Sequence, residues 1–291
     1  MPNQLLKSFW VGVKRRWLDG LRSGFGGLGV VWTLTEMSTA AFPAADVYLK
    51  AHGGDYIQLM GLLFLAIFLA FVIEPTHVTF KVPTTDTKIT LKYGDLFAED
   101  ANLLIGVSEF FDGELGAPVS KASLHGQFII RNFGGSAVAF RAAVDPALAA
   151  NGVAPMATAR PVQPSSAYPI GTTIRVSNGA HSAFLMAMAR ADHTTYKAAS
   201  DPPTLLTALK GGLQVVHDLG NGEALAMPLF GNGQSGINLT PQHLLRLLTL
   251  ALVDFGRNSD SQLPKRVTIV LHDRCFEELD IREIARDWTR V

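Results

Sequence analysis

Residues 224–236 read ALAMPLFGNGQSG, a short apolar strand that runs directly into a glycine-rich loop. The strand, Ala224 to Phe230, carries no charge, which is typical of a strand buried inside an α/β sheet. Gly231, Gly233 and Gly236 follow it. Closely spaced glycines free the backbone, so that successive N–H groups can point at one anion. A diphosphate is the natural ligand for such a loop, and a simple tight turn is the alternative explanation.

The sequence on both sides of this loop predicts strands that alternate with helices from about Val78 onward. Expected strands cover 79–82, 88–93, 102–111, 172–176, 182–189, 224–230 and 266–272, and expected helices cover 203–217, 240–255 and 276–288. Thr240 is a natural N-cap, Pro241 suits the first helical position, and Gly256 is expected to end that helix. Residues 142–169 have little pattern and are interpreted as a helix plus an irregular loop. The fold class is a mixed α/β sheet flanked by helices.

Ligands of such sheets gather beyond the carboxyl ends of the strands. Three loops follow expected strands there, at residues 94–97, 109–118 and 228–236. We expect these loops to form one binding site.

Short motifs in these loops resemble the macro domain, the ADP-ribose-binding module. Gly94-Asp95-Leu96 is similar to the Gly-Asp-Ile that follows a strand in that family. Residues 228–236 keep the length of the family's late Pro-Ala-Ile-Ser-Thr-Gly-Ile-Tyr-Gly motif, with its first Pro, sixth Gly and last Gly. Residues 168–172 resemble its Pro-Gly turn before the middle strand. The resemblance runs from about Ile89 to Trp288.

The resemblance implies that Asp95 accepts a hydrogen bond from the adenine amino group. It also implies that residues 231–235 cradle the diphosphate through backbone N–H groups. The ligand-binding residues expected on this basis are Asp95, Leu96, Ser108, Glu109, Phe110, Phe111, Asp112, Gly116, Ala117, Phe230, Gly231, Asn232, Gly233, Gln234, Ser235 and Gly236.

The second loop departs from the family. Typical macro domains have Asn-Ala-Ala-Asn followed by a run of three glycines, whereas this chain has Ser108-Glu109-Phe110-Phe111-Asp112. The asparagine that contacts the distal ribose, and assists hydrolysis in many members, is absent. This departure argues against ADP-ribosyl hydrolase activity and favours a modified ligand. The acidic residues Glu109, Asp112 and Glu114 suit a cationic group attached at that end.

The first 75 residues have a different composition. Ile57 to Ile73 reads IQLMGLLFLAIFLAFVI, which has no charge and is apolar on every face. About 20 helical residues span the hydrocarbon core of a bilayer, so this run predicts a transmembrane helix, with a buried core helix as the alternative. Gly24 to Phe42 is a second expected span, rich in small residues and carrying Glu36. A carboxylate in lipid is costly, so Glu36 should line a pore or oligomer seam, or be buried neutral against a neighbour.

Basic residues set the expected orientation, because short cytoplasmic flanks are enriched in Lys and Arg. Lys7, Lys14, Arg15, Arg16 and Arg22 precede the first span, whereas the connecting segment 43–56 holds only Lys50. Lys81, Lys88 and Lys92 follow the second span. We therefore expect a multi-pass protein of the bacterial inner membrane with both termini in the cytoplasm, and an anchor rather than a cleaved signal peptide.

The expected organisation has three parts: a basic amphipathic segment at 1–23, a two-helix transmembrane hairpin at 24–75, and a cytoplasmic macro-like domain at 76–291. This architecture resembles the membrane-anchored effectors of type II Thoeris antiphage systems. The resemblance implies that a partner TIR-domain enzyme makes histidine-ADP-ribose from NAD, which the effector binds. The effector would then oligomerise and disrupt the bilayer, arresting or killing the infected cell by abortive infection.

The remaining composition excludes several other classes. The chain has a formal net charge of zero and a sequence pI of about 7.1, so no global basic field attracts nucleic acid. Its single cysteine, Cys275, rules out an intrachain disulfide and a four-cysteine zinc site. The eight histidines show no metal-ligand spacing, so no metal or cofactor is expected. Two functions stay open: a non-enzymatic sensor, and a membrane-anchored hydrolase of ADP-ribose derivatives.

Overall fold

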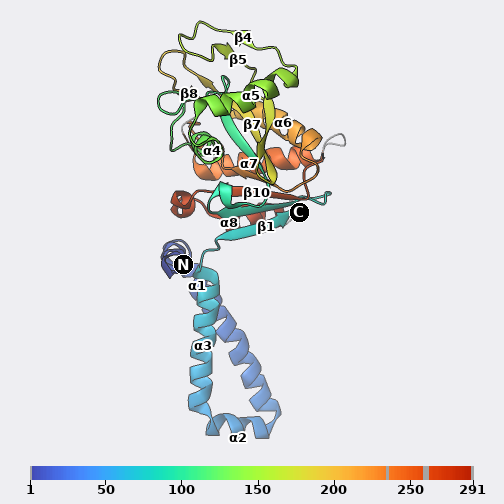
Figure 1. The fold of residues 1–291 in the computed structure, drawn as a ribbon. Coiled ribbons are helices and arrows are strands. Elements are labelled where there is room, and N and C mark those ends of the chain that lie inside the picture. Colours follow the sequence, from blue (N-terminus) through green and yellow to red (C-terminus); the bar gives the residue numbers. More distant parts are fainter. Residues whose placement is uncertain (1, 234–235, 258–261, 290–291) are drawn as a thin grey trace. The chain divides into compact units, whose positions relative to one another are not determined.

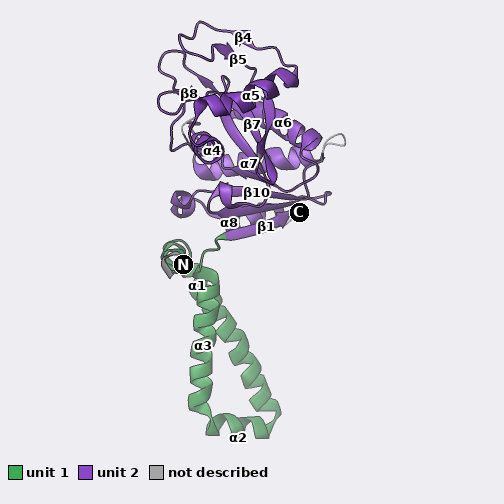
Figure 2. Cartoon of the chain, viewed as in Figure 1, with its two compact units in different colours: residues 1–76 green, residues 77–291 purple. Residues whose placement is uncertain are grey.

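The computed structural model describes residues 2–233, 236–257 and 262–289 (Figure 1). The chain divides into two compact units, residues 1–76 and residues 77–291 (Figure 2). Each unit has its own secondary structure: the first is helical and the second is built around a mixed sheet.

Unit 1 contains the helices α1 (Pro2–Ala41), α2 (Pro43–Ala51) and α3 (Gly53–Val72). The helix α1 is kinked at Arg16, whose φ of −136° is not helical. It continues past residue 23, where the sequence analysis set a boundary. The connecting segment 43–56, expected as a loop, is helical as well, because Pro43 occupies the first turn of α2 and fits that position without losing a hydrogen bond.

Glycines on α1 allow it to pack against α3. A Cβ added at Gly24 would lie 2.6 Å from the ring of Phe64, and one added at Gly27 would lie 2.5 Å from Ile67. The hydroxyl of Tyr56 also donates to Oγ1 of Thr35 at 3.0 Å. Small residues thus let the two helices approach closely, as expected for helices that associate in lipid.

The helix α3 matches the apolar run of the sequence. Among the described residues it alone is long and apolar enough to cross a membrane, and only 11% of its most apolar window is buried. That low burial is not what a core helix of unit 1 would show. Glu36, the predicted seam residue, lies on the exposed surface of α1.

Unit 2 is built on a mixed sheet in the order β1-β2-β10-β9-β3-β7-β6, with β8 paired to β7. The strands are β1 (His77–Lys81), β2 (Lys88–Tyr93), β3 (Asn102–Ser108), β6 (Thr173–Asn178), β7 (His181–Ala191), β8 (Ala198–Ala199), β9 (Leu225–Pro228) and β10 (Arg266–Leu271). The five strands from β2 to β7 in this order run parallel, and β1, β6 and β8 pair antiparallel. A separate hairpin joins β4 (Met156–Ala157) to β5 (Ser166–Ala167).

Helices cover both faces of this sheet. They are α4 (Leu124–Phe133), α5 (Ala137–Asn151), α6 (Pro202–Leu219), α7 (Pro241–Arg257) and α8 (Ile281–Thr289). Successive residues of β3 point to opposite faces: Leu104 packs with residues of α6 and α7, while Leu103 and Ile105 pack with residues of α4 and α5. The nearly continuous apolar character of β3 and β7 follows from burial on both sides.

The structure corrects several expected boundaries. The strand expected at 102–111 ends at Ser108, because the chain turns there and Phe111 takes a positive φ of 50°. Gly256 does not end α7, which continues to Arg257. The single helix expected at 276–288 is two elements, the 3-10 helix η2 (Asp273–Glu277) and α8. The amphipathic pattern continues across residues 278–280, so it did not indicate the break there.

Candidate functional site

Parallel strands bring five loops to one edge of the sheet. The carboxyl ends of β2, β10, β9, β3 and β7 lead into the segments 94–98, 272–277, 229–239, 109–119 and 192–197. Neighbouring loops are joined by hydrogen bonds, for example from Gly94 N to Leu271 O at 3.0 Å. The three loops selected from the sequence therefore share one edge, where ligands of open α/β sheets bind.

The first loop exposes Asp95 and buries Leu96. The carboxylate of Asp95 accepts a hydrogen bond from Phe97 N at 3.1 Å, which caps the 3-10 helix η1 (Leu96–Ala98). It also pairs with Nη2 of Arg131 at 3.0 Å, and the guanidinium lies 4.5 Å from the Phe97 ring centroid. Leu96 is 3% exposed and belongs to the core, so only its backbone is available to a ligand.

The second loop is mostly closed. Phe110 and Phe111 are fully buried, and Asp112 is 2% exposed. Ser108, half-buried, donates its hydroxyl to Oδ2 of Asp112 at 2.8 Å. Gly116 and the adjoining Ala117 are the predicted residues that this loop exposes fully.

Glu109 is the half-buried carboxylate of the second loop. Its backbone N–H donates to Ala189 O at 2.9 Å, and Oε1 accepts a hydrogen bond from Ala191 N at 3.3 Å. Burial raises the pKa of Glu109, and the hydrogen bond from Ala191 opposes this effect. Glu109 therefore lies half-buried at the carboxyl edge of the sheet, held against the end of β7.

An arginine that the sequence analysis did not select completes this loop. Nη1 of Arg160 donates to Oδ1 of Asp112 at 2.6 Å, and the arginine side chain is 0% exposed. Its guanidinium lies over the rings of Phe110 and Tyr196, at 4.2 and 5.2 Å from their centroids. Arg160 lies between β4 and β5, in the patternless segment 142–169, where no local motif signals a buried ion pair.

The third loop needs its first glycine for packing. Gly231 is buried at a φ of 83°, and a Cβ there would lie 2.8 Å from Ile237. Phe230 is 4% exposed and packs into the core. Phe230 and Gly231 therefore fix where the loop leaves the sheet. Being buried, they leave contact with a ligand to the loop residues after Gly231.

The rest of the third loop is tied to the segment after β10. Nδ2 of Asn232 donates to Sγ of Cys275 at 3.0 Å, and Nη2 of Arg274 donates to Asn232 O at 3.0 Å. Gly233 is exposed, no atom of the described residues lies within 4 Å of a Cβ added to it, and Gly236 N donates to Gly233 O at 3.3 Å. The predicted residues Gln234 and Ser235 lie outside the described residues.

Cys275 is buried, and burial raises the pKa of its thiol. A buried thiol with a raised pKa is a poor nucleophile near neutral pH. Cys275 therefore packs in the core and accepts a hydrogen bond from Asn232.

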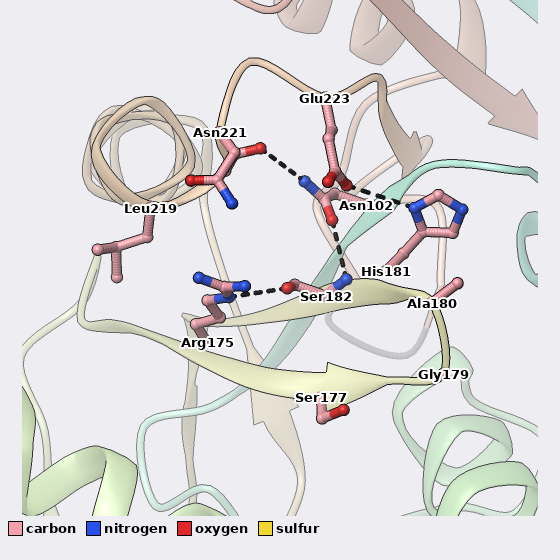
Figure 3. Close-up of a pocket in the computed structure, with 11 residues that line it drawn as sticks. Asn102, Arg175, Ser177, Gly179, Ala180, His181, Ser182, Leu219, Asn221 and Glu223 are labelled. Atoms are coloured by element: carbon pink, nitrogen blue, oxygen red, sulfur yellow. Dashed lines mark hydrogen bonds and ion pairs between the residues drawn. The ribbon is translucent and has the colours of Figure 1, made fainter.

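A polar cavity of about 300 Å³ lies at the opposite edge of the sheet, where β3 and β7 begin (Figure 3). Asn102 bridges its walls, since Nδ2 donates to Gly220 O at 3.1 Å and Oδ1 accepts from Ser182 N at 2.8 Å. Nε of Arg175 donates to the hydroxyl of Ser182 at 2.7 Å. The polar groups that line this cavity join β3, β7 and the end of α6. None of the predicted ligand residues lines the cavity.

Comparison with known proteins gives one family and a group of solved folds. No curated protein matches the chain. The Oceanobacillus iheyensis macrodomain with MES bound aligns with a TM-score of 0.48 at 12% identity, over 72% of this chain and 98% of that one. The macrodomain of the same organism with ADP aligns with a TM-score of 0.45 at 11% identity, over 74% and 98%.

The family described as Thoeris protein ThsA, Macro domain, matches residues 89–272. The matched segment starts in β2, ends just after β10, and contains the loops that follow β2, β3, β7 and β9 at the carboxyl edge. Since it spans more than half of the sequence, the chain belongs to the Thoeris ThsA macro-domain family.

Proposed function

We propose that this chain is a membrane-anchored sensor of an ADP-ribose derivative, histidine-ADP-ribose, in Thoeris antiphage defence. The ligand occupies the carboxyl edge of the sheet in unit 2. Its binding favours assembly of the helices of unit 1 in the bilayer, and the assembled protein disrupts the membrane. A partner TIR-domain enzyme supplies the ligand.

The observation that carries this proposal is the family match over residues 89–272, which includes the loops after β2, β3, β7 and β9 at that edge. The site has the chemistry for a dinucleotide-like ligand. Asp95 is an exposed acceptor suited to an adenine amino group, and Gly233 is an exposed glycine whose open surroundings leave room for a diphosphate.

Sensing rather than hydrolysis is supported by the second loop. Hydrolysis needs a carboxylate or amide free to activate water within hydrogen-bond reach of the reacting carbon. Asp112 is occupied by Arg160 and Ser108 and is almost fully buried. Each of its oxygens therefore already accepts a hydrogen bond within the loop, and its burial keeps it from an exposed ligand.

The hydrolase alternative rests on Glu109, whose half-buried carboxyl has a raised pKa and suits a general acid or base. The test is product analysis after incubation of the chain with ADP-ribose conjugates. Turnover that is lost in Glu109→Gln would revive the enzyme, whereas intact conjugates after prolonged incubation support the sensor.

The membrane part of the proposal rests on α3 and the exposed apolar surface of unit 1. Ile57, Leu59 and Leu62 are 73%, 63% and 65% exposed, which a helix in water would not maintain over a continuous surface. The Gly24–Ala41 half of α1 packs against α3 and completes a proposed hairpin. Glu36, exposed on α1, would then face a second copy rather than lipid. Both termini lie in the cytoplasm in this proposal.

Ligand binding is the first test. The full chain, purified in detergent, is titrated with histidine-ADP-ribose, ADP-ribose and NAD by calorimetry. Binding with preference for the histidine conjugate is expected, and no binding of any of the three would refute the proposal.

A paired substitution assigns the site. Gly233→Leu introduces a side chain into open space at the third loop, so it should block the ligand without disturbing the core. Ala180→Leu creates the same side chain on an exposed turn at the opposite edge of the sheet and serves as the control. We expect at least about tenfold weaker binding for the first variant, equivalent to about 1.4 kcal/mol, and unchanged binding for the second.

A further inference from the structure

The side chain of Arg160 is a fully buried cation held by a single carboxylate. Its Nη1 donates to Oδ1 of Asp112 at 2.6 Å and to Pro164 O at 3.0 Å. Nε and Nη2 are buried and have no hydrogen-bond partner among the described residues. One whole edge of the guanidinium is therefore unsatisfied.

Such an edge is unusual in a folded protein. A buried N–H group without an acceptor costs about 1–3 kcal/mol, and more where the donor is charged. The Nε and Nη2 atoms form the fork of the guanidinium that matches the two oxygens of a carboxylate or phosphate with parallel hydrogen bonds. The free edge of Arg160 is thus chemically prepared for an oxyanion.

Aromatic rings from two different loops set the plane of this guanidinium. Its Cζ lies 4.2 Å from the ring centroid of Phe110 and 5.2 Å from that of Tyr196. Phe110 belongs to the loop after β3 and is fully buried. Tyr196 takes a φ of 59° in the turn that begins at Asp192 and follows β7. Arg160 is therefore oriented by residues that come from the carboxyl ends of two adjacent parallel strands.

This position coincides with one end of the proposed binding site. The resemblance to macro domains associates the loop after β3 with the distal ribose, the end of ADP-ribose at which a conjugated group is attached. Glu109, in the same loop, is a half-buried carboxylate that suits an ammonium group. The guanidinium of Arg160 can bind the carboxylate of an α-amino acid, and the carboxylate of Glu109 can bind its ammonium group.

We propose that Arg160 is the residue that selects a ligand whose distal end bears a carboxylate, by binding that carboxylate through Nε and Nη2. The inference rests on the proposed function. It names the part of the ligand that is recognised by the second loop, whose sequence departs from the typical macro-domain motif. Because the free edge is closed to solvent in this conformation, the segment 158–165 or the turn 192–197 moves when the ligand enters. Asp112 keeps Nη1 in place throughout.

Three ligands distinguish the carboxylate from the diphosphate as the anion bound. They are histidine-ADP-ribose, the histamine conjugate of ADP-ribose, which keeps the imidazole but lacks the carboxylate, and ADP-ribose itself. Binding to the full chain in detergent is measured by calorimetry. The wild-type chain should prefer the histidine conjugate over the histamine conjugate by at least about tenfold, since hydrogen bonds between charged groups are the strong ones.

Arg160→Met should remove this preference and leave the affinities for the histamine conjugate and for ADP-ribose within about threefold of wild type. This variant leaves the buried carboxylate of Asp112 without its cation, and the unpaired charge can unfold the loop. The double variant Arg160→Met/Asp112→Asn removes both charges and tests the same preference in a neutral site. Thermal unfolding verifies that each variant is folded.

Arg141→Met is the matched control. Nη1 of Arg141 donates to Phe111 O at 3.1 Å, so this arginine contacts the same loop but not its buried pair. It should leave the preference unchanged.

Each outcome decides the inference. Equal weakening of all three ligands in both Arg160 variants would point to the diphosphate and overturn it. A preference that survives both Arg160 variants would overturn it as well, while the proposed function would stand. Failure of the wild-type chain to bind any ligand would remove the proposed function, and this inference with it.

Discussion

Acid should weaken unit 2 through one buried histidine. His125 lies in the first turn of α4, is 6% exposed, and packs with its ring centroid 5.4 Å from that of Phe140. Its Nε2 is buried without a hydrogen-bond partner among the described residues. Burial lowers its pKa from 6.5 to about 3, so the folded protein keeps the imidazole neutral.

The magnitude follows from the difference between the folded and unfolded pKa values. Because the folded value is lower, the contribution is complete above pH 6.5 and is lost as the pH falls toward 3. At pH 5, about 1.5 pH units below the unfolded pKa, His125 is protonated in the unfolded chain but neutral in the folded chain. At about 1.36 kcal/mol per unit, unfolding becomes easier by about 2 kcal/mol.

The variant His125→Leu removes this titration at similar volume. Calorimetric unfolding of the full chain in detergent is compared at pH 7.5 and pH 5.0. The decrease in Tm between the two should be about 4–8 °C larger for wild type than for the variant, given about 2–4 °C per kcal/mol for a domain of this size. His77→Gln, at an exposed position of β1, should behave like wild type. An equal decrease in wild type and His125→Leu would refute the reasoning.

Three further predictions follow from the same contacts. Asn102→Ala leaves Gly220 O and a strand N–H without partners in a buried position, so the free energy of unfolding should fall by about 2–4 kcal/mol, measured by thermal unfolding. Arg246→Gln removes an ion pair to Glu283 at 2.6 Å, but the guanidinium is 39% exposed, so stability should change by less than about 1 kcal/mol in the same assay. If Glu36 lies at a seam between copies in the membrane, Glu36→Gln should reduce ligand-dependent dye release from vesicles while calorimetric ligand affinity stays unchanged; unaltered release would argue against the seam.

Much of unit 2 is encoded locally. The alternation in Lys88 to Tyr93 and the apolar run Arg266 to His272 predicted β2 and β10 to within one residue. The helix expected at 203–217 is α6, and Asp201, which accepts a hydrogen bond from Thr204 N at 2.8 Å, caps it. Patterns of this kind report burial of one face, and burial is what selects the element.

Boundaries and pairings are less accessible from sequence. Phe110 and Phe111 extend the apolar run of β3, yet they leave the strand, because the chain turns after Ser108 to bury both rings. The connection 43–56 was expected as a loop between two spans, yet it contains the helix α2, whose first turn Pro43 fits. For Phe110 and Phe111 the burial of both rings outweighs the local pattern.

By itself, the sequence determined the apolar segment that became α3, the long strands of unit 2 together with α6 and α7, and the three loops that meet at the carboxyl edge, but it did not predict α4. Only the tertiary structure decided what the second loop contains. Asp112 appeared available to a ligand, but Arg160, 48 positions away, is paired with it at 2.6 Å. Periodicity registers which residues are buried, whereas an ion pair between two loops depends on how the sheet brings their ends together.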